Sequence, residues 1–159
     1  MTPHPEIAFW VPIVTLGLTV VILAANVFYV YKFRESVDIQ RRTSQGTLLV
    51  SINKQFFYSE PHKKIIRCLE EGKNVRTKSR GISDEDLDDH VGMLDTIGTF
   101  VRAEILDESL VYELFSHYII CTYESPDIAE YIKECQRKDG ELFSDFMWVY
   151  KKMKQRKAA

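Results

Sequence analysis

The sequence predicts an all-α protein in which one N-terminal transmembrane helix continues into a cytoplasmic bundle of about five helices. Two observations carry this prediction. Residues Ile7 to Tyr31 form one uncharged apolar run, IAFWVPIVTLGLTVVILAANVFYVY. After that run, apolar residues recur at spacings of three and four, and no segment shows the sustained alternation that is typical of a strand.

The apolar run is long enough to cross a bilayer. It has 25 residues, and only Asn26 is strongly polar. At about 1.5 Å per residue, a helix of this length reaches roughly 37 Å, which exceeds a hydrocarbon core of about 30 Å. A helix that is apolar on every side is typical of a membrane span, so the bilayer is the first predicted partner. A cleaved signal peptide is the alternative, but the run is too long and no basic residue precedes it.

The charges beside the span predict its orientation. Met1 to Glu6 carry no Lys or Arg, whereas four basic residues follow the span: Lys32, Arg34, Arg41 and Arg42. Basic residues favour the cytoplasmic side, so we expect the C-terminal part in the cytoplasm and the inner or plasma membrane as the location. We expect five residues at the membrane interfaces: Trp10, Tyr29, Tyr31, Lys32 and Arg34. Asn26 either contacts a second helix through a polar bond or reaches the headgroups.

The rest of the chain, Lys32 to Ala159, has 128 residues, enough for one compact domain. It holds all 21 basic and 22 of the 23 acidic residues, so its net charge is −1. This balance argues against a nucleic-acid partner, because nucleic-acid binders usually carry a strong basic excess. The three cysteines, Cys68, Cys121 and Cys135, share no close spacing and suit reduced thiols in the cytoplasm.

The first part of the domain is predicted as two helices and a loop. Nothing before Pro61 ends the helical pattern that begins at Lys32, although Gly46 leaves a break near Ser44 open. Ser59 is a candidate N-cap for a short helix that ends at Gly72. The basic stretch from Lys73 to Gly81 has no apolar period and is expected as an exposed loop.

Four further helices are predicted from capping residues and apolar stripes. Ser83 with Asp86 forms a capping-box variant for a helix that ends near Glu104, and Asp107 caps the next. That next helix has a broad apolar surface and is the expected centre of the bundle: Leu110, Val111, Leu114, Phe115, Tyr118, Ile119 and Ile120. Ser125-Pro126 begins a helix to about Lys138. The last helix carries Leu142, Phe146, Val149, Tyr150 and Met153 on one face.

The predicted organisation therefore has five parts. They are an extracytoplasmic N-terminus (1–6), the transmembrane helix (7–31), a juxtamembrane helix (32–58), a helical cytoplasmic domain (59–154) and a basic tail (155–159).

The chain resembles an uncharacterised prokaryotic family, domain of unknown function forty-seven-sixty. The resemblance rests on the order of its parts and on a Phe-x-x-x-x-Pro-His stretch from Phe56 to His62. It is greatest at Leu94-Asp95-Thr96-Ile97-Gly98-Thr99-Phe100-Val101, followed by Ile105-Leu106-Asp107 and Leu114-Phe115. It implies a membrane-anchored helical protein of bacterial origin and assigns no catalytic residue.

No motif points to catalysis, a cofactor or a metal. His62, His90 and His117 with the cysteines lack any paired-ligand spacing, and Cys–His catalysis needs a proximity that sequence does not show. The acidic run from Asp84 to Asp95 has Asp89 where a calcium loop needs Gly, so it is better explained as a helix start. We therefore expect no catalytic, cofactor-binding or metal-binding residues, and no small-molecule substrate.

The resulting hypothesis is a membrane-tethered interaction module, an adaptor or sensor that binds a partner protein or itself. The alternative is a toxin-like or defence-type effector that oligomerises through its span and permeabilises the membrane, for which Asn26 is the only support. We expect the basic residues of the loop 73–80 and of the tail either to be ordinary solvent-exposed charges or to contact anionic lipid.

Overall fold

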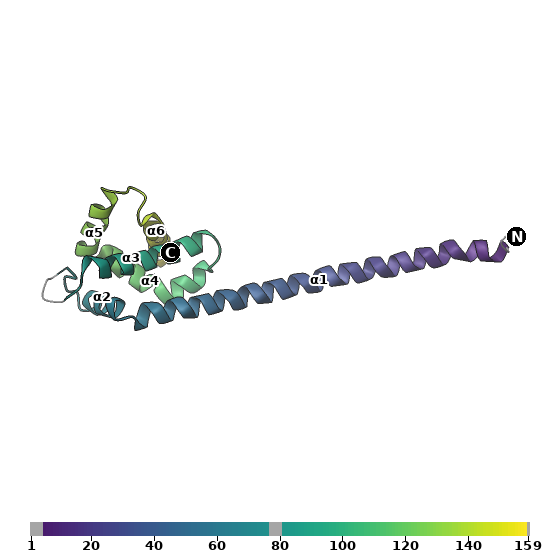
Figure 1. Cartoon of the computed structure of the whole chain (residues 1–159), viewed down its shortest axis with the longest axis horizontal. Helices are drawn as coiled ribbons and strands as arrows, with labels where there is room; N and C mark the ends of the chain where they lie inside the picture. The colour runs from purple at the N-terminus through teal and green to yellow at the C-terminus, as the bar shows by residue number, and fades with distance from the viewer. Residues whose placement is uncertain (1–4, 77–80, 159) are drawn as a thin grey trace. The chain divides into compact units, whose positions relative to one another are not determined.

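The structure, a computed structural model, describes the backbone of residues 5–76 and 81–158 and the side chains of residues 15–76 and 81–158. This part of the chain is all-helical, as predicted, and no strand occurs in it. The six helices are α1 (Pro5–Tyr58), α2 (Glu60–Glu70), α3 (Asp84–Arg102), α4 (Glu108–Glu124), α5 (Pro126–Gln136) and α6 (Ser144–Ala158) (Figure 1). The chain divides into two units, Met1–Ser44 and Gln45–Ala159.

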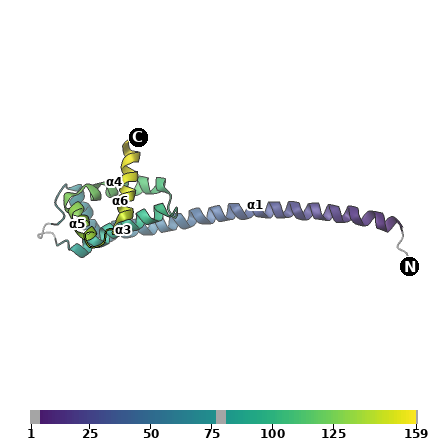
Figure 2. The same cartoon turned by 90° about the horizontal axis from the view of Figure 1, so that it is seen from above.

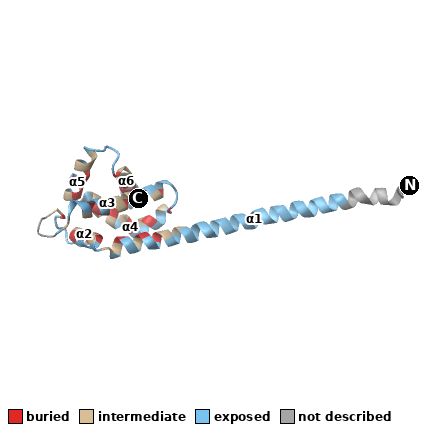
Figure 3. Ribbon diagram, viewed as in Figure 1, coloured by how far each residue is buried: buried red, intermediate tan, exposed pale blue. Residues whose placement is uncertain are grey.

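In the first unit, the apolar side chains that the structure describes are all exposed along α1. Between Leu16 and Tyr31 the large hydrophobic side chains are 52 to 70% accessible, and none of the described residues from 15 to 44 is buried (Figure 3). By length and composition this helix can cross a membrane. Tyr29 and Tyr31 lie on its exposed surface, whereas the side chain of Trp10 lies outside the described residues. The break left open near Ser44 is absent, because α1 is helical through this point.

The second unit has one apolar core to which every helix contributes. The last turns of α1 bury Leu49, Ile52 and Phe56, and α2 adds Ile65 and Ile66. Ser59 stands at the predicted N-cap of α2 but makes no side-chain cap bond, and Pro61 occupies the first turn, where a missing N–H costs little. Gly72, with φ of 60°, follows the helix end as predicted.

Side-chain caps fix the starts of α3 and α4. The Ser83 hydroxyl accepts from the Asp86 N–H at 3.1 Å, and the Asp86 carboxylate accepts from the Ser83 N–H at 2.8 Å, so the predicted capping box is confirmed. The Asp107 carboxylate accepts from the N–H groups of Ser109 and Leu110. On α3 the predicted stripe is fully buried: Leu87, Val91, Leu94, Ile97 and Val101.

The broad apolar surface of α4 is only partly covered. Val111, Phe115 and Ile119 are buried, but Leu110 and Leu114 remain 41 and 42% accessible. Helix α4 does contact α2, α3, α5 and α6, in line with a central position. The most extensive contact in the unit, however, is between α3 and α6.

Helices α3 and α6 pack with very close backbones (Figures 1 and 2). A Cβ added at Gly98 of α3 would lie 2.6 Å from the carbonyl carbon of Asp145 and even nearer to its oxygen. Asp95 accepts a 2.8 Å bond from the Phe146 N–H, so α3 satisfies a free N–H in the first turn of α6. The Asp145 carboxylate binds Thr99 and Arg102, and these bonds lower the pKa of Asp145. The block of strongest family resemblance therefore includes three α3 residues of this contact, Asp95, Gly98 and Thr99.

The last helix differs at both ends from the prediction. Leu142 precedes α6 and is 36% accessible, while the remaining stripe residues, Phe146, Val149, Tyr150 and Met153, are buried. Residues 155–158, predicted as a separate basic tail, continue α6 and are exposed.

We predict that Gly98→Ala destabilises the protein by about 1 to 3 kcal/mol, because the new methyl group forces α3 away from the backbone of α6. The matched control is Gly92→Ala on the same helix, where a Cβ meets nothing within 4 Å. There alanine should stabilise by about 0.5 to 1 kcal/mol. Chemical denaturation of the two variants measures both effects, and equal stabilities would contradict this packing.

Candidate functional site

Two histidines lie side by side in the apolar core of the second unit. His62, in the first turn of α2, is 4% accessible, and His90 of α3 is completely buried. Their Nδ1 atoms are 3.2 Å apart, and the Nε2 of His90 is 3.3 Å from the hydroxyl of Thr122, which is also fully buried. The three side chains form a line of hydrogen bonds from α4 through α3 to α2.

Two arrangements of protons fill both hydrogen bonds, and one of them also gives the buried hydroxyl hydrogen of Thr122 an acceptor; we infer that this arrangement is the one adopted. Thr122 Oγ1 has no other bond within the described chain, so its O–H finds an acceptor only in His90 Nε2. His90 then carries its proton on Nδ1 and donates it to His62 Nδ1. It follows that His62 is protonated on Nε2, and this N–H makes no bond to the described residues.

Phe56, near the end of α1, covers both imidazole rings. Its ring stacks on His62 at a centroid distance of 5.7 Å and on His90 at 5.2 Å. Phe115 and Tyr118 of α4 meet the edges of Phe56. Aromatic rings therefore cover one side of the hydrogen-bonded line, which joins α2, α3 and α4 beside the end of α1.

Burial in the core keeps both histidines neutral. Burial, and to a smaller extent a charge on His62, lowers the pKa of His90 to about 3. Burial also lowers the pKa of His62, although the nearby carboxylates of Asp89 and Asp86 oppose the shift. At neutral pH the pair therefore acts as a donor and an acceptor and carries no charge.

His62 lines a groove of about 490 Å³ between the end of α1 and α3. The apolar lining comes from Leu48, Ile52, Met93, Ile97 and Phe100, and the polar lining from Ser51, Gln55, Ser59, Asp89 and Thr96. A volume of this size and a mixed lining are typical of a ligand site. The groove with the line His62–His90–Thr122 is the candidate site of this protein.

The third histidine lies elsewhere. His117 is exposed on α4, where its ring nitrogens are 3.8 Å from the Cys121 sulfur. Burial raises the pKa of the Cys121 thiol, which therefore stays protonated and lacks the thiolate that nucleophilic catalysis needs. No group of three metal-ligating side chains occurs among the residues that the structure describes.

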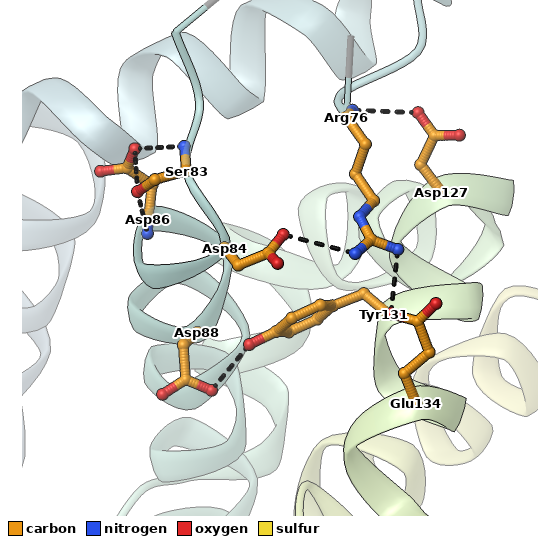
Figure 4. A network of polar contacts seen from close by, with 8 residues as sticks. All are labelled: Arg76, Ser83, Asp84, Asp86, Asp88, Asp127, Tyr131 and Glu134. Carbon is orange, nitrogen blue, oxygen red and sulfur yellow. Dashed lines mark hydrogen bonds and ion pairs between the residues drawn. The ribbon is translucent and has the colours of Figure 1, made fainter. Parts of the chain in front are cut away.

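A second polar cluster holds the loop between α2 and α3 (Figure 4). The Arg76 N–H donates to Asp127, and its guanidinium pairs with Asp84 and Glu134 at 3.4 and 3.1 Å. Tyr131, over which Arg76 lies, donates to Asp88 at 3.0 Å. Because Arg76 is already paired, it has little charge left to bind a lipid surface. The same contacts give Asp84 and Asp88, two members of the acidic run from Asp84 to Asp95, a role in holding the fold together.

Other predicted lipid-binding residues are also partly paired. Lys73 pairs with Glu71, whereas residues 77–80 lie outside the described part of the chain. On α6, Lys154 bonds to Glu124 and Arg156 lies over the Tyr112 ring at 4.5 Å.

Sequence reasoning missed the groove and Thr122, but it had one usable signal. His62 stands in register with Ile65, Ile66 and Leu69, and His90 with Leu87 and Leu94. A histidine on an apolar stripe predicts a buried polar group that needs a partner. The identity of the partner depends on α4, which no local pattern connects to either residue.

These features define a class: helical proteins in which one long apolar helix precedes a compact helical unit. The chain belongs to the family described as Domain of unknown function (DUF4760), whose family profile matches residues 13–153. This confirms the resemblance expected from the sequence. No curated protein and no solved structure gave a match.

We predict that acid destabilises the protein before its carboxylates titrate. The pKa of His90 is about 3 in the folded state against 6.5 unfolded, so the unfolded chain binds more protons between these values. Stability is therefore complete above about pH 6.5 and falls below it, by about 1.5 kcal/mol for one such histidine between pH 6.5 and 5. Urea denaturation of the full chain in detergent measures the loss.

Two variants test the assignment of this loss. His117→Gln, at an exposed histidine, should lose as much stability between pH 6.5 and 5 as the wild type. His90→Leu should lose less stability over the same range. A wild-type stability that is flat between pH 6.5 and 5 would contradict the buried neutral pair.

Proposed function

We propose that this chain is a single-pass protein of the inner or plasma membrane whose second unit lies in the cytoplasm and binds another protein, as an adaptor or sensor. The observation that carries the proposal is the exposed apolar surface of α1. Ile22, Leu23 and Val27 are 52 to 65% accessible on a helix with no buried residue in its apolar window. At about 25 cal/mol per Å² of apolar surface, this exposure in water is costly, and lipid removes the cost.

The orientation is supported by the charges that follow the span. Lys32 pairs with Glu35 at 2.7 Å, and Arg34, Arg41 and Arg42 are exposed on the same stretch of α1. Such residues stay on the cytoplasmic side, with Lys32 and Arg34 at the interface together with Tyr29 and Tyr31.

Binding rather than catalysis is supported by the chemistry of the candidate site. His62 and His90 form a neutral pair that is held rigidly by Phe56 and Thr122, and the hydroxyl at its inner end is fully buried. A catalytic nucleophile needs access to its substrate, which Thr122 lacks. The groove offers instead a fixed set of donors and acceptors beside apolar side chains, and this arrangement suits recognition.

We predict that Val20→Arg with Leu23→Arg releases the protein from membranes. Each arginine at the centre of a span opposes insertion by about 2.5 to 3.5 kcal/mol. The matched control places the same two charges on the same helix but in the second unit, at Val50 and Tyr58, both 69% accessible. Alkaline carbonate extraction should leave the wild type and the control in the membrane pellet. A wild-type protein in the soluble fraction would refute the anchor.

The orientation has its own test. A fluorescent protein that folds only in the cytoplasm should fluoresce when fused after Ala159. A dark fusion that is nevertheless made in full would reverse the assigned topology.

A further inference from the structure

The candidate groove has the length of a short extended peptide. Its lining runs from Leu48 on α1 to Ser59, which directly follows that helix, and from Asp89 to Phe100 along α3. Each of these stretches rises by about 16 Å. An extended peptide rises about 3.3 Å per residue, so about five residues fit its length.

The polar lining matches a peptide main chain better than a lipid tail. Ser51 and Gln55 carry hydroxyl and amide groups that both donate and accept, and the Thr96 hydroxyl, which donates to the Gly92 carbonyl at 2.9 Å, can still accept. A peptide offers one N–H and one C=O at nearly every residue, whereas an acyl chain would cover Ser51 and Gln55 without giving them partners.

His62 adds a donor of fixed direction. Its Nδ1 is occupied by His90, its side chain is almost completely buried, and its Nε2–H has no partner within the described chain. A nearly buried donor gains most from an acceptor that excludes water, such as a peptide carbonyl. Thr122 determines this donor indirectly. Its O–H donates to His90 Nε2, which places the proton of His90 on Nδ1 and therefore the proton of His62 on Nε2.

Asp89 gives the groove its charge. It is exposed at the end where His62 lies, and it is the only charged residue of the described lining. A carboxylate or phosphate ligand would be repelled there, whereas a Lys or Arg side chain would be attracted.

We propose that this groove binds an extended peptide segment of a partner protein, with apolar side chains against Met93 and Ile97, a main-chain carbonyl on His62, and a Lys or Arg side chain on Asp89. The proposal rests on the proposed function and names the kind of partner. Its test does not depend on which way the protein is inserted.

The probe is the peptide acetyl-Leu-Val-Lys-Val-Leu-amide, and its counterpart has Glu in place of Lys. The full chain, labelled with ¹⁵N-histidine, is held in nanodiscs of zwitterionic lipid, and empty nanodiscs report peptide binding to lipid alone. The four histidines of the sequence give a spectrum simple enough to follow His62. The Lys peptide should shift the His62 imidazole signals saturably and bind about tenfold more tightly than the Glu peptide, a difference of about 1.4 kcal/mol.

Three variants separate the contributions. Asp89→Asn should bring the two affinities within about twofold, whereas Glu130→Gln, an equal charge change at an exposed residue of α5, should leave the tenfold ratio. Thr122→Val should weaken the binding of both peptides and leave the ratio of their affinities unchanged. It removes the hydroxyl that sets the proton positions on the two histidines, and it does not alter Asp89.

The proposal is overturned by any of three results. The first is no shift of His62 up to about 5 mM peptide, which is also expected if lipid or a second copy of the chain fills the groove. The second is equal binding of the two peptides to the wild type. The third is an unchanged ratio in Asp89→Asn. None of these results changes the carbonate extraction, so a failure here is distinguishable from a failure of the membrane anchor.

Discussion

The second unit depends on a line of two hydrogen bonds in an otherwise apolar core. Thr122, His90 and His62 come from three helices, and Phe56 from a fourth covers both rings. A buried polar group without a partner costs about 1 to 3 kcal/mol, so α2, α3 and α4 have little freedom to shift against one another. In the inferred proton pattern, the buried hydroxyl of Thr122 also determines that His62 presents an N–H to the groove. The contacts that hold the three helices together would then also orient the donor of the proposed binding site.

A second constraint acts on the other side of α3. The absence of a side chain at Gly98 lets α6 approach closely, while Asp95 and Thr99 bond to the first turn of that helix. Helix α3 thus faces the histidine line with one side and the α6 backbone with another. Its groove residues, Asp89, Met93 and Thr96, are carried by a helix that contacts α2, α4 and α6. Sites on rigid elements hold their geometry more precisely than sites on loops, so the proposed ligand would meet side chains in fixed positions.

Sequence reasoning succeeded where the determinants are local and failed where they are not. The capping box of Ser83 and Asp86 and the cap at Asp107 involve neighbouring residues, so their patterns predicted the helix starts correctly. The apolar period of α3 predicted its buried face for the same reason. The exposure of Leu110 and Leu114 could not be predicted, because α4 has more apolar surface than its neighbours cover. The continuity of α1 at Gly46 overrode a propensity cost of only about 1 kcal/mol. The pairing of His62 with His90 joins residues 28 positions apart, and the groove exists only once α1 and α3 are packed.

The most direct test of this account is the proton pattern of the two buried rings. A ¹⁵N-histidine correlation spectrum of the full chain in nanodiscs at neutral pH distinguishes Nδ1–H from Nε2–H in each imidazole. The account predicts a neutral His90 with its proton on Nδ1 and a neutral His62 with its proton on Nε2. A His90 with its proton on Nε2 would reverse both hydrogen bonds and remove the donor that His62 presents to the groove, and a positive charge on either ring would contradict the buried neutral pair.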